Sequence, residues 1–331
     1  MPGRSTSSRR PGSSSAAAAT ADARPILKWA GGKRQLLPEL RRFYPDRFSR
    51  YIEPFVGSGA LFLDLHNRGR LDDRSALLAD SNHDVIGCYQ AVRDGVDQVI
   101  AALRELEDGY RRGGQAHFYE VRDERFNPLR RSVFAPGGRT RYPPALAAML
   151  IYLNRTGYNG LYRLNARGEF NVPAGRYAAP RICDADNLRQ VAAAFGRARL
   201  RLQVGAFDRV LRGARLGDFI YIDPPYAPLS ATARFTSYTA GGFGPEDQVR
   251  LRDLVIELAR RGCQVLLSNS TAPEIRELYV DDRRARAAGL RAHEVPARRA
   301  INSRASGRGP VMEYLIANIR PARRAQSRRG S

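Results

Sequence analysis

Cysteine, histidine and long apolar runs are scarce in this chain of 331 residues. The three cysteines, Cys88, Cys183 and Cys263, are far apart and form no Cys-x-x-Cys pair, and the four histidines are scattered. This spacing argues against a disulfide framework or a metal site and favours a reducing, cytoplasmic location. The longest apolar runs, such as residues 146–153, fall short of the roughly 20 residues that a membrane span needs. We therefore expect no membrane segment, and the weakly apolar residues 1–24 do not resemble a secretory signal.

Lysine is almost absent although the chain is strongly basic. Of 55 basic side chains only Lys28 and Lys33 are lysines, and both lie in the segment Lys-Trp-Ala-Gly-Gly-Lys with the single tryptophan, Trp29. A lysine ammonium is a compact point charge, whereas an arginine guanidinium is a wide planar fork. The pattern points to a tight site that requires lysine, and chance placement is the alternative.

The formal net charge is +22, and only part of it lies in the two tails. Residues 1–24 contain four arginines and one aspartate, and residues 320–331 contain five arginines and no acid. The region between them is therefore strongly basic, which favours a polyanionic partner such as nucleic acid. Compositional drift toward arginine is the alternative explanation. Residues 1–24 and 321–331 contain too little apolar sequence to fold and are expected to be disordered basic tails.

Strands and helices alternate at both ends of the region between the tails. We expect a helix over residues 60–67 and another over 245–261, where Leu251, Leu254, Val255 and Leu258 share one face. Strands are expected at residues 51–53, 76–79, 218–222, 265–267, 295–301 and 312–319. Repeated strand–helix–strand units predict an α/β protein with a doubly wound sheet.

The middle of the chain departs from this alternation. Residues 85–180 are mostly helical by composition, with helices expected over 96–106 and 145–153, and end in a polar segment rich in Tyr and Asn. Asn159-Gly160 within that segment is a tight-turn signal. We therefore predict that residues 85–180 form an inserted domain ending in an exposed hairpin or loop, between two halves of a main domain at residues 25–84 and 181–320.

A glycine-containing loop follows the first expected strand. Phe55, Gly57 and Gly59 lie between that strand and a helix, and Asp80 ends the next strand, where an acid can bind ribose hydroxyls. The third glycine of a dinucleotide fingerprint is absent. The loop therefore favours a nucleoside ligand without a pyrophosphate, although such a glycine turn is often only a turn.

A second cluster, Asp223-Pro224-Pro225-Tyr226, stands at the carboxyl end of an apolar strand. A carboxylate beside an aromatic ring can hold a flat amine, because the acid accepts an N–H bond and the ring stacks on the face. The alternative is a simple proline-rich strand exit.

With these motifs in their order, the chain resembles the Dam family of DNA adenine-N6 methyltransferases. The run YNGLYRLNARGEFNVPAGRY at residues 158–177 makes the resemblance specific. It spans about residues 25–320, and the matching segments are 28–33, 54–59, 78–80, 154–177 and 221–238. It implies a Rossmann-like methyltransferase sheet with an inserted, mostly helical target-recognition domain, and transfer of a methyl group from S-adenosylmethionine to a flipped adenine in duplex DNA, with GATC as the sequence.

The resemblance also implies roles for individual residues. Asp223 and the Pro224 carbonyl would accept the N6 hydrogens, and Tyr226 would stack on the adenine. No metal is implied. The implied cofactor-binding residues are Trp29, Lys33, Phe55, Gly57, Gly59, Asp80 and Asp223.

The implied contacts with DNA come from Lys28 and the end of the insertion. Lys28 would contact the first guanine of GATC and Arg163 the last guanine-containing pair, since arginine bidentate to guanine is the commonest specific contact. Tyr158 would intercalate beside the flipped adenine, and Asn159 would lie near the orphaned thymine. Leu161 and Pro173 would touch a thymine methyl. The implied phosphate contacts are Asn165, Asn171 and Arg176.

Several alternatives stay open at this stage. The substrate could be another DNA sequence or RNA, and a DNA-binding regulator without turnover is the alternative from a different class. A monomer is expected, since no sustained heptad is present. A partner restriction endonuclease or repair factor is neither indicated nor excluded.

Overall fold

The computed structural model describes residues 22–29, 31–137, 141–227, 243–297 and 311–323. In this part of the chain seven strands form one sheet, in the order β3-β2-β1-β4-β5-β7-β6. All neighbouring strands pair in parallel except β7, which is antiparallel to β5 and to β6. The strands are β1 (Arg50–Glu53), β2 (Ser75–Asp80), β3 (Leu200–Val204), β4 (Phe219–Ile222), β5 (Gln264–Ser270), β6 (Arg291–Ala297) and β7 (Val311–Ala317).

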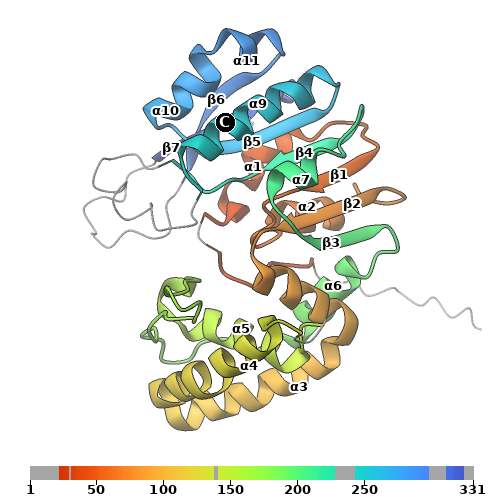
Figure 1. The fold of residues 1–331 in the computed structure, drawn as a ribbon. Coiled ribbons are helices and arrows are strands. Elements are labelled where there is room, and N and C mark those ends of the chain that lie inside the picture. The colour runs from red at the N-terminus through yellow and green to blue at the C-terminus, as the bar shows by residue number, and fades with distance from the viewer. Residues whose placement is uncertain (1–21, 30, 138–140, 228–242, 298–310, 324–331) are drawn as a thin grey trace, which may run out of the picture.

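Helices cover both faces of the sheet and form a separate part beyond its β3 edge (Figure 1). The helices beside the sheet are α1 (Leu37–Leu40), α2 (Ala60–Asn67), α6 (Ala185–Phe195), α7 (Phe207–Leu211), α9 (Pro245–Arg260), α10 (Pro273–Ile275) and α11 (Arg283–Ala287). The helical part contains α3 (His83–Glu120), α4 (Asn127–Phe134) and α5 (Pro144–Thr156). Short turns of 3₁₀ or π helix are η1 (Lys33–Gln35), η2 (Arg41–Phe43), η3 (Val121–Phe126), η4 (Tyr158–Gly160) and η5 (Arg276–Asp281). No helix of the described residues is long and apolar enough to cross a membrane.

Alternation along the strands divides the sheet into two buried faces. Tyr51 and Leu266 belong to one apolar cluster, whereas their neighbours Ile52 and Leu267 belong to the other, with α9. Successive side chains of a strand point to opposite faces, so strands covered on both sides are continuously apolar. This arrangement confirms the doubly wound α/β class expected from the sequence.

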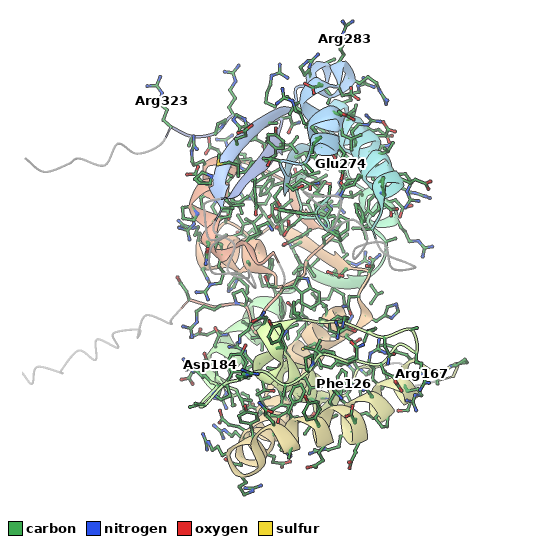
Figure 2. The ribbon with its side chains drawn as sticks, turned by 90° about the vertical axis from the view of Figure 1, so that its left-hand side faces the viewer. Phe126, Arg167, Asp184, Glu274, Arg283 and Arg323 are labelled. Carbon is green, nitrogen blue, oxygen red and sulfur yellow. The ribbon has the colours of Figure 1, made fainter. Side chains whose placement is uncertain are left out.

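One of these clusters continues from the sheet into the helical part. It contains Phe62 and Leu78 beside the sheet together with Phe126 and Tyr152 of the helical part. Figure 2 shows Phe126 and Arg167 in the helical part, at the end of the molecule opposite to Arg283. The helical part is therefore packed against the sheet through a shared core.

Helix α3 links the two parts and is much longer than the expected helix over residues 96–106. Its backbone departs from helical geometry at Gly95 (φ −156°) and Gly114 (φ +52°). Before Gly95 the helix lies against the sheet, where Gln90 Nε2 donates to the Leu202 carbonyl of β3 at 3.2 Å. The expected helix over residues 96–106 covers only part of the segment between the two breaks, and glycine, which has low helix propensity, interrupts the pattern on either side.

Two edge strands differ from the sequence expectations. Strand β3 was not predicted, and β6 begins at Arg291, four residues before the expected strand at 295–301, of which residues 298–301 lie outside the described chain. Both strands lie at an edge of the sheet and carry exposed polar side chains. Such strands lack the continuous apolar run that identifies a central strand. The two tails also lie largely outside the described residues.

A buried aspartate at the start of α3 joins three elements of the helical part. Asp84 is fully buried and accepts hydrogen bonds from Tyr142 Oη (2.9 Å), Tyr162 Oη (2.5 Å) and Arg130 Nε (2.7 Å). Tyr162 belongs to the polar segment that follows α5, so this carboxylate connects that segment to α3 and α4. A buried charge is tolerated only when it is paired and hydrogen-bonded, as it is here.

Replacing Asp84 with alanine should strongly destabilise the protein. The change leaves the Arg130 guanidinium without its carboxylate and removes the acceptor of two tyrosine hydroxyls, a loss of about 3–5 kcal/mol in the free energy of unfolding. Urea unfolding followed by circular dichroism measures it. The matched control is Asp94→Ala, because Asp94 pairs with Arg93 at the surface, where loss of an ion pair costs about 0–1 kcal/mol. Equal stability of the two variants would refute this role for Asp84.

Candidate active site

The candidate site lies at the carboxyl edge of the sheet, where three adjacent parallel strands end. Strands β2, β1 and β4 are neighbours. The glycine loop follows β1, Asp80 ends β2, and Asp223 follows β4. Open α/β sheets bind ligands outside the carboxyl ends of their strands. The topology therefore brings both sequence motifs to one edge.

Backbone geometry explains both glycines of the loop. Gly57 and Gly59 have φ angles of +44° and +66°, in the left-handed region that favours glycine. The Gly57 amide donates to Asp80 Oδ2 at 3.0 Å, and the Asn82 amide donates to Oδ1 at 2.9 Å. Tyr89 Oη donates to the Gly57 carbonyl at 2.5 Å. The loop is thus fixed against the acid that the sequence predicted as a ribose acceptor.

Burial raises the pKa of Asp80, and its bonds to backbone amides oppose that shift. A carboxylate has about four acceptor positions, so it can bind further hydroxyls in addition to these amides. Asp80 can therefore accept hydrogen bonds from the hydroxyls of a nucleoside ribose.

Trp29 packs against the glycine loop and also against the polar segment after α5. A Cβ atom on Gly57 would lie 2.7 Å from Trp29 Cδ1, so the indole occupies the space that a side chain would need. The Trp29 ring also stacks on Tyr162, with centroids 5.7 Å apart and an interplanar angle of 30°. Trp29 therefore contacts both the predicted cofactor loop and the predicted recognition segment.

Phe55 belongs to an aromatic group at the same edge. Its ring stacks on that of Phe207 of α7 and packs edge-to-face with that of Phe243, with ring centroids 5.6 Å apart in each pair. Phe55 is half-buried, so part of its ring remains accessible to a flat ligand. The sequence analysis did not identify Phe207 or Phe243.

The Asp223 carboxylate is paired with Lys33. Lys33 Nζ lies 2.9 Å from Asp223 Oδ1, with side-chain exposures of 6% and 20%. The same ammonium donates to the Gly31 carbonyl at 2.5 Å and lies 4.7 Å from the centroid of the Tyr226 ring. The Lys33 ammonium therefore contacts a carboxylate, a carbonyl and a ring face at once, an arrangement that suits a compact cation better than the wide guanidinium of arginine. The structure places Lys33 against the acid of the second motif.

Electrostatic effects on Asp223 act in opposite directions. Burial raises the pKa of Asp223, while the charge of Lys33 and the hydrogen bonds from Lys33 and Ser268 lower it. A second acid, Glu53 at the end of β1, is buried and accepts a hydrogen bond from Tyr51 Oη at 2.8 Å. Burial raises the pKa of Glu53 well above its usual value. Burial thus raises the pKa of Asp80, Glu53 and Asp223, and among these three acids Asp223 is the one in an ion pair with a described residue.

The residues predicted to contact DNA are largely at the surface. Lys28, Tyr158, Asn159, Arg163, Pro173 and Arg176 are exposed, whereas Leu161, Asn165 and Asn171 are half-buried. Antiparallel bridges join Gly157 to Ala174 and Leu164 to Phe170. This segment forms a surface hairpin in which the chain reverses at residues 165–169. The expected Asn159-Gly160 turn lies before that reversal, in η4, with Asn159 at φ +54°.

Lys28 is fixed to this hairpin through its backbone. The Lys28 amide donates to Asn154 Oδ1 at 2.7 Å, and Asn154 Nδ2 donates to the carbonyls of Lys28 and Gly160, each at 2.9 Å. The Lys28 ammonium lies 4.7 Å from the centroid of the Tyr177 ring. A Cβ atom on Gly160 would lie 2.6 Å from Lys28 Cβ, so the turn packs directly on the lysine stem.

Within the hairpin, the predicted residues also bind one another. Arg163 Nε donates to Asn171 Oδ1 at 2.7 Å, and its Nη2 donates to the Asn171 carbonyl at 3.2 Å. Asn165 Oδ1 accepts from the amides of Arg167 and Glu169 at 2.9 and 3.0 Å and so closes the turn. Asn171 therefore orients Arg163, a role that the sequence did not suggest.

Besides Phe207 and Phe243, three further site residues were missed from the sequence. Ser268 Oγ donates to Asp223 Oδ1 at 2.8 Å, Tyr226 Oη donates to Glu313 Oε2 at 2.7 Å, and Tyr162 joins Trp29 to Asp84. The polar run 268–270 directly after the apolar residues 265–267 was a usable signal, because it marks a strand end. Glu313 gave no comparable signal. No group of three or more His, Cys, Asp or Glu that could hold a metal occurs in the described ranges.

A doubly wound sheet with a glycine loop, an acid after the next strand and Asp-Pro-Pro-Tyr defines an S-adenosylmethionine-dependent methyltransferase. A family model described as D12 class N6 adenine-specific DNA methyltransferase matches residues 29–301. The chain therefore belongs to the D12 class of N6 adenine-specific DNA methyltransferases, and it resembles the DNA adenine methylases within that class.

Similar proteins match over nearly the whole chain. The DNA adenine methylase of Escherichia coli K12 is 38% identical over 292 residues, which cover 88% of this chain and 94% of that protein. The Type II methyltransferase M1.LlaDCHI of Lactococcus lactis subsp. cremoris is 36% identical over 300 residues, covering 89% and 95%. The Type II methyltransferase M.MjaIII of Methanocaldococcus jannaschii is 35% identical over 308 residues, covering 90% and 99%.

Replacing Gly57 with alanine should weaken binding of S-adenosylmethionine at least about tenfold, because the new methyl group meets the Trp29 ring and the loop has a positive φ. Isothermal titration with the cofactor measures the dissociation constant. The matched control is Gly213→Ala, where a Cβ atom would meet nothing within 4 Å. Unchanged cofactor affinity in Gly57→Ala would contradict the assignment of this loop to the cofactor.

Proposed function

We propose that this enzyme methylates the N6 atom of adenine within GATC in duplex DNA, after the adenine has left the helix. The observation that carries the proposal is the stack of Trp29 on Tyr162. Trp29 is adjacent in sequence to Lys28, and Tyr162 is adjacent to Arg163; Lys28 and Arg163 are the two residues predicted to read bases. One aromatic contact thus connects both predicted readers to the glycine loop against which Trp29 packs.

Lys28 and Arg163 can each bind a guanine, one at each end of the proposed GATC site. Lys28 and Arg163 are exposed side chains, and guanine presents two acceptors, O6 and N7, in the major groove. The bonds from Arg163 to Asn171 orient the guanidinium before DNA binds, which lowers the entropy cost of recognition. Asn165 and Arg176 belong to the same hairpin and would position the phosphates.

Burial of Asp223 supports base flipping. Only one fifth of its side chain is exposed, so an amino group stacked inside a duplex cannot reach the carboxylate. Enzymes that modify a base solve this problem by turning the nucleotide out of the helix. Tyr158, which is 48% exposed on the hairpin, is placed at the surface where it could fill the space left behind.

The chemistry needs positioning rather than a covalent nucleophile. Bound S-adenosylmethionine supplies an electrophilic methyl group on its sulfonium. Asp223 and the Pro224 carbonyl would accept the two N6 hydrogens and direct the nitrogen lone pair at the methyl, and the Tyr226 ring would hold the base plane. The charge of Lys33 favours the ionised form of Asp223, and that carboxylate would take the N6 proton as the new bond forms. Such placement of charge supplies most of the rate enhancement in reactions of this kind.

The remaining expectations belong to the same proposal. We propose that the enzyme acts as a monomer, and that its basic tails add salt-sensitive contacts with DNA phosphates. Methylation of another DNA sequence or of RNA, and binding without turnover, are outcomes that the following experiment distinguishes.

Methyl transfer from labelled S-adenosylmethionine tests the proposal on two unmethylated duplexes, one with GATC and one with that adenine changed to thymine. Label should enter only the GATC duplex, as N6-methyladenine. Asp223→Ala should abolish the transfer and still bind DNA, because the acceptor is lost while the exposed readers remain.

Label in both duplexes would overturn the GATC assignment. Label in neither, with the cofactor still bound, would favour another nucleic acid or a binding protein without turnover. Activity retained by Asp223→Ala would refute the role of this carboxylate.

Replacing Arg163 with alanine should relax specificity at one base pair. The wild-type protein should prefer GATC over the other GATN duplexes, and loss of the bidentate contact should reduce this preference by about 1–3 kcal/mol. Ratios of kcat/KM among the four duplexes measure the change. The matched control is Arg167→Ala, an exposed arginine of the same hairpin that is not a predicted base contact. An unchanged preference in Arg163→Ala would rule out the reading role.

A further inference from the structure

Three consecutive residues at the end of β5 hold the Asp-Pro-Pro-Tyr segment. Ser268 Oγ donates to Asp223 Oδ1 at 2.8 Å, and Ser270 Oγ donates to the Ala227 carbonyl at 2.8 Å. Between them, Asn269 Nδ2 donates to Gln248 Oε1 at 3.2 Å, and Gln248 Nε2 donates to the Pro225 carbonyl at 3.0 Å.

These supports are buried, and they differ in what they bind. Ser268, Asn269, Ser270 and Gln248 are between 0% and 4% exposed. Ser270 and Gln248 bind backbone carbonyls and therefore fix the path of the chain. Ser268 is the member of this group that binds the reactive carboxylate itself.

The contacts to Asp223 converge on one of its two oxygens. Lys33 Nζ lies 2.9 Å from Oδ1, and Ser268 Oγ lies 2.8 Å from the same atom. Within the described ranges, the hydrogen bond and the ion pair of this carboxylate both go to Oδ1. Two donors on one oxygen restrain the rotation of the carboxylate and leave the acceptor positions of Oδ2 for another partner.

The serine hydroxyl has a defined direction because of its other neighbour. Tyr221 Oη lies 3.1 Å from Ser268 Oγ, and burial raises the pKa of Tyr221 well above its usual value, so the phenol keeps its proton. Ser268 has one hydroxyl proton. An ionised Asp223 can only accept, so the serine donates its proton to the carboxylate. The Tyr221 phenol must then donate its own proton to Ser268 Oγ. Tyr221, Ser268 and Asp223 then form a chain of donors that ends at Oδ1, and such chains strengthen each of their bonds.

We propose that Ser268 is a positioning residue for methyl transfer, which together with Lys33 occupies Oδ1 of Asp223 and so leaves Oδ2 as the atom that accepts the adenine amino group. The inference rests on the proposed role of Asp223 as acceptor of the N6 hydrogen. It is independent of GATC specificity, because it concerns any adenine that reaches the site.

The test is the single-turnover rate of N6-methyladenine formation as a function of pH. The substrate is PCR-amplified DNA, which carries no methylation and contains every short sequence, so the result does not depend on GATC. Ser268→Ala is compared with Ser270→Ala, since both serines are buried on β5 but Ser270 binds a backbone carbonyl. Thermal unfolding and cofactor affinity of both variants report any structural damage.

Ser268→Ala should lower the rate at saturating substrates by about tenfold or more, because a hydrogen bond to a charged group is lost. KM for DNA and cofactor affinity should change less than about twofold, since Ser268 would act on the carboxylate and not on binding. The acid limb of the rate profile should move to higher pH. The sign follows because Ser268 stabilises the ionised form: without it the pKa of Asp223 rises, and the carboxylate is protonated at a higher pH.

Two further variants keep the test decisive if Ser268→Ala folds poorly. Tyr221→Phe leaves the serine in place and should shift the acid limb in the same direction by a smaller amount. Ser268→Thr retains a hydroxyl and should restore the wild-type profile.

The proposal would be overturned if Ser268→Ala and Ser270→Ala had the same single-turnover rate and the same acid limb in the pH profile. An acid limb that Tyr221→Phe leaves unmoved would also overturn it. A wild-type protein that methylates the amplified DNA at sites other than GATC would refute the proposed specificity while leaving this test intact.

Discussion

The buried ion pair between Lys33 and Asp223 is the contact on which the arrangement of the site depends. It ties the segment before the first strand to the end of β4, two regions far apart in the chain. Removing two charges from water is unfavourable unless each finds good partners, and here the ammonium also meets the Gly31 carbonyl and the Tyr226 ring. In the same short segment of the chain as Lys33, Trp29 lies against the glycine loop and Lys28 lies against the hairpin.

A second connection joins the helical part to the sheet. The Trp29 and Tyr162 rings stack, and Tyr162 is in turn bound to Asp84 at the start of α3. The same helix donates from Gln90 to β3, the edge strand of the sheet. The hairpin and the glycine loop therefore share supports, so residues that are predicted to read DNA stand close to residues that are predicted to hold the cofactor.

The buried carboxylates of this basic chain have different partners, and those partners distinguish their roles. Asp84 is surrounded by an arginine and two tyrosines and is fully buried, which is typical of a structural acid. Glu53 has a tyrosine partner and a pKa raised by burial. Asp223 retains some exposure and has its donors on one oxygen, which leaves it able to bind a substrate group.

The sequence by itself determined the class of sheet, the two motifs at its carboxyl edge and the family, because a glycine loop or a strand-end acid is set by residues that are neighbours in the chain. It could not show that Ser268 binds the Asp223 carboxylate, that Asp84 gathers three elements, or that α3 runs through two glycines. These features depend on contacts between residues that are distant in sequence, and no local pattern encodes which buried donor will meet which acceptor. Only the tertiary packing of these elements decided them.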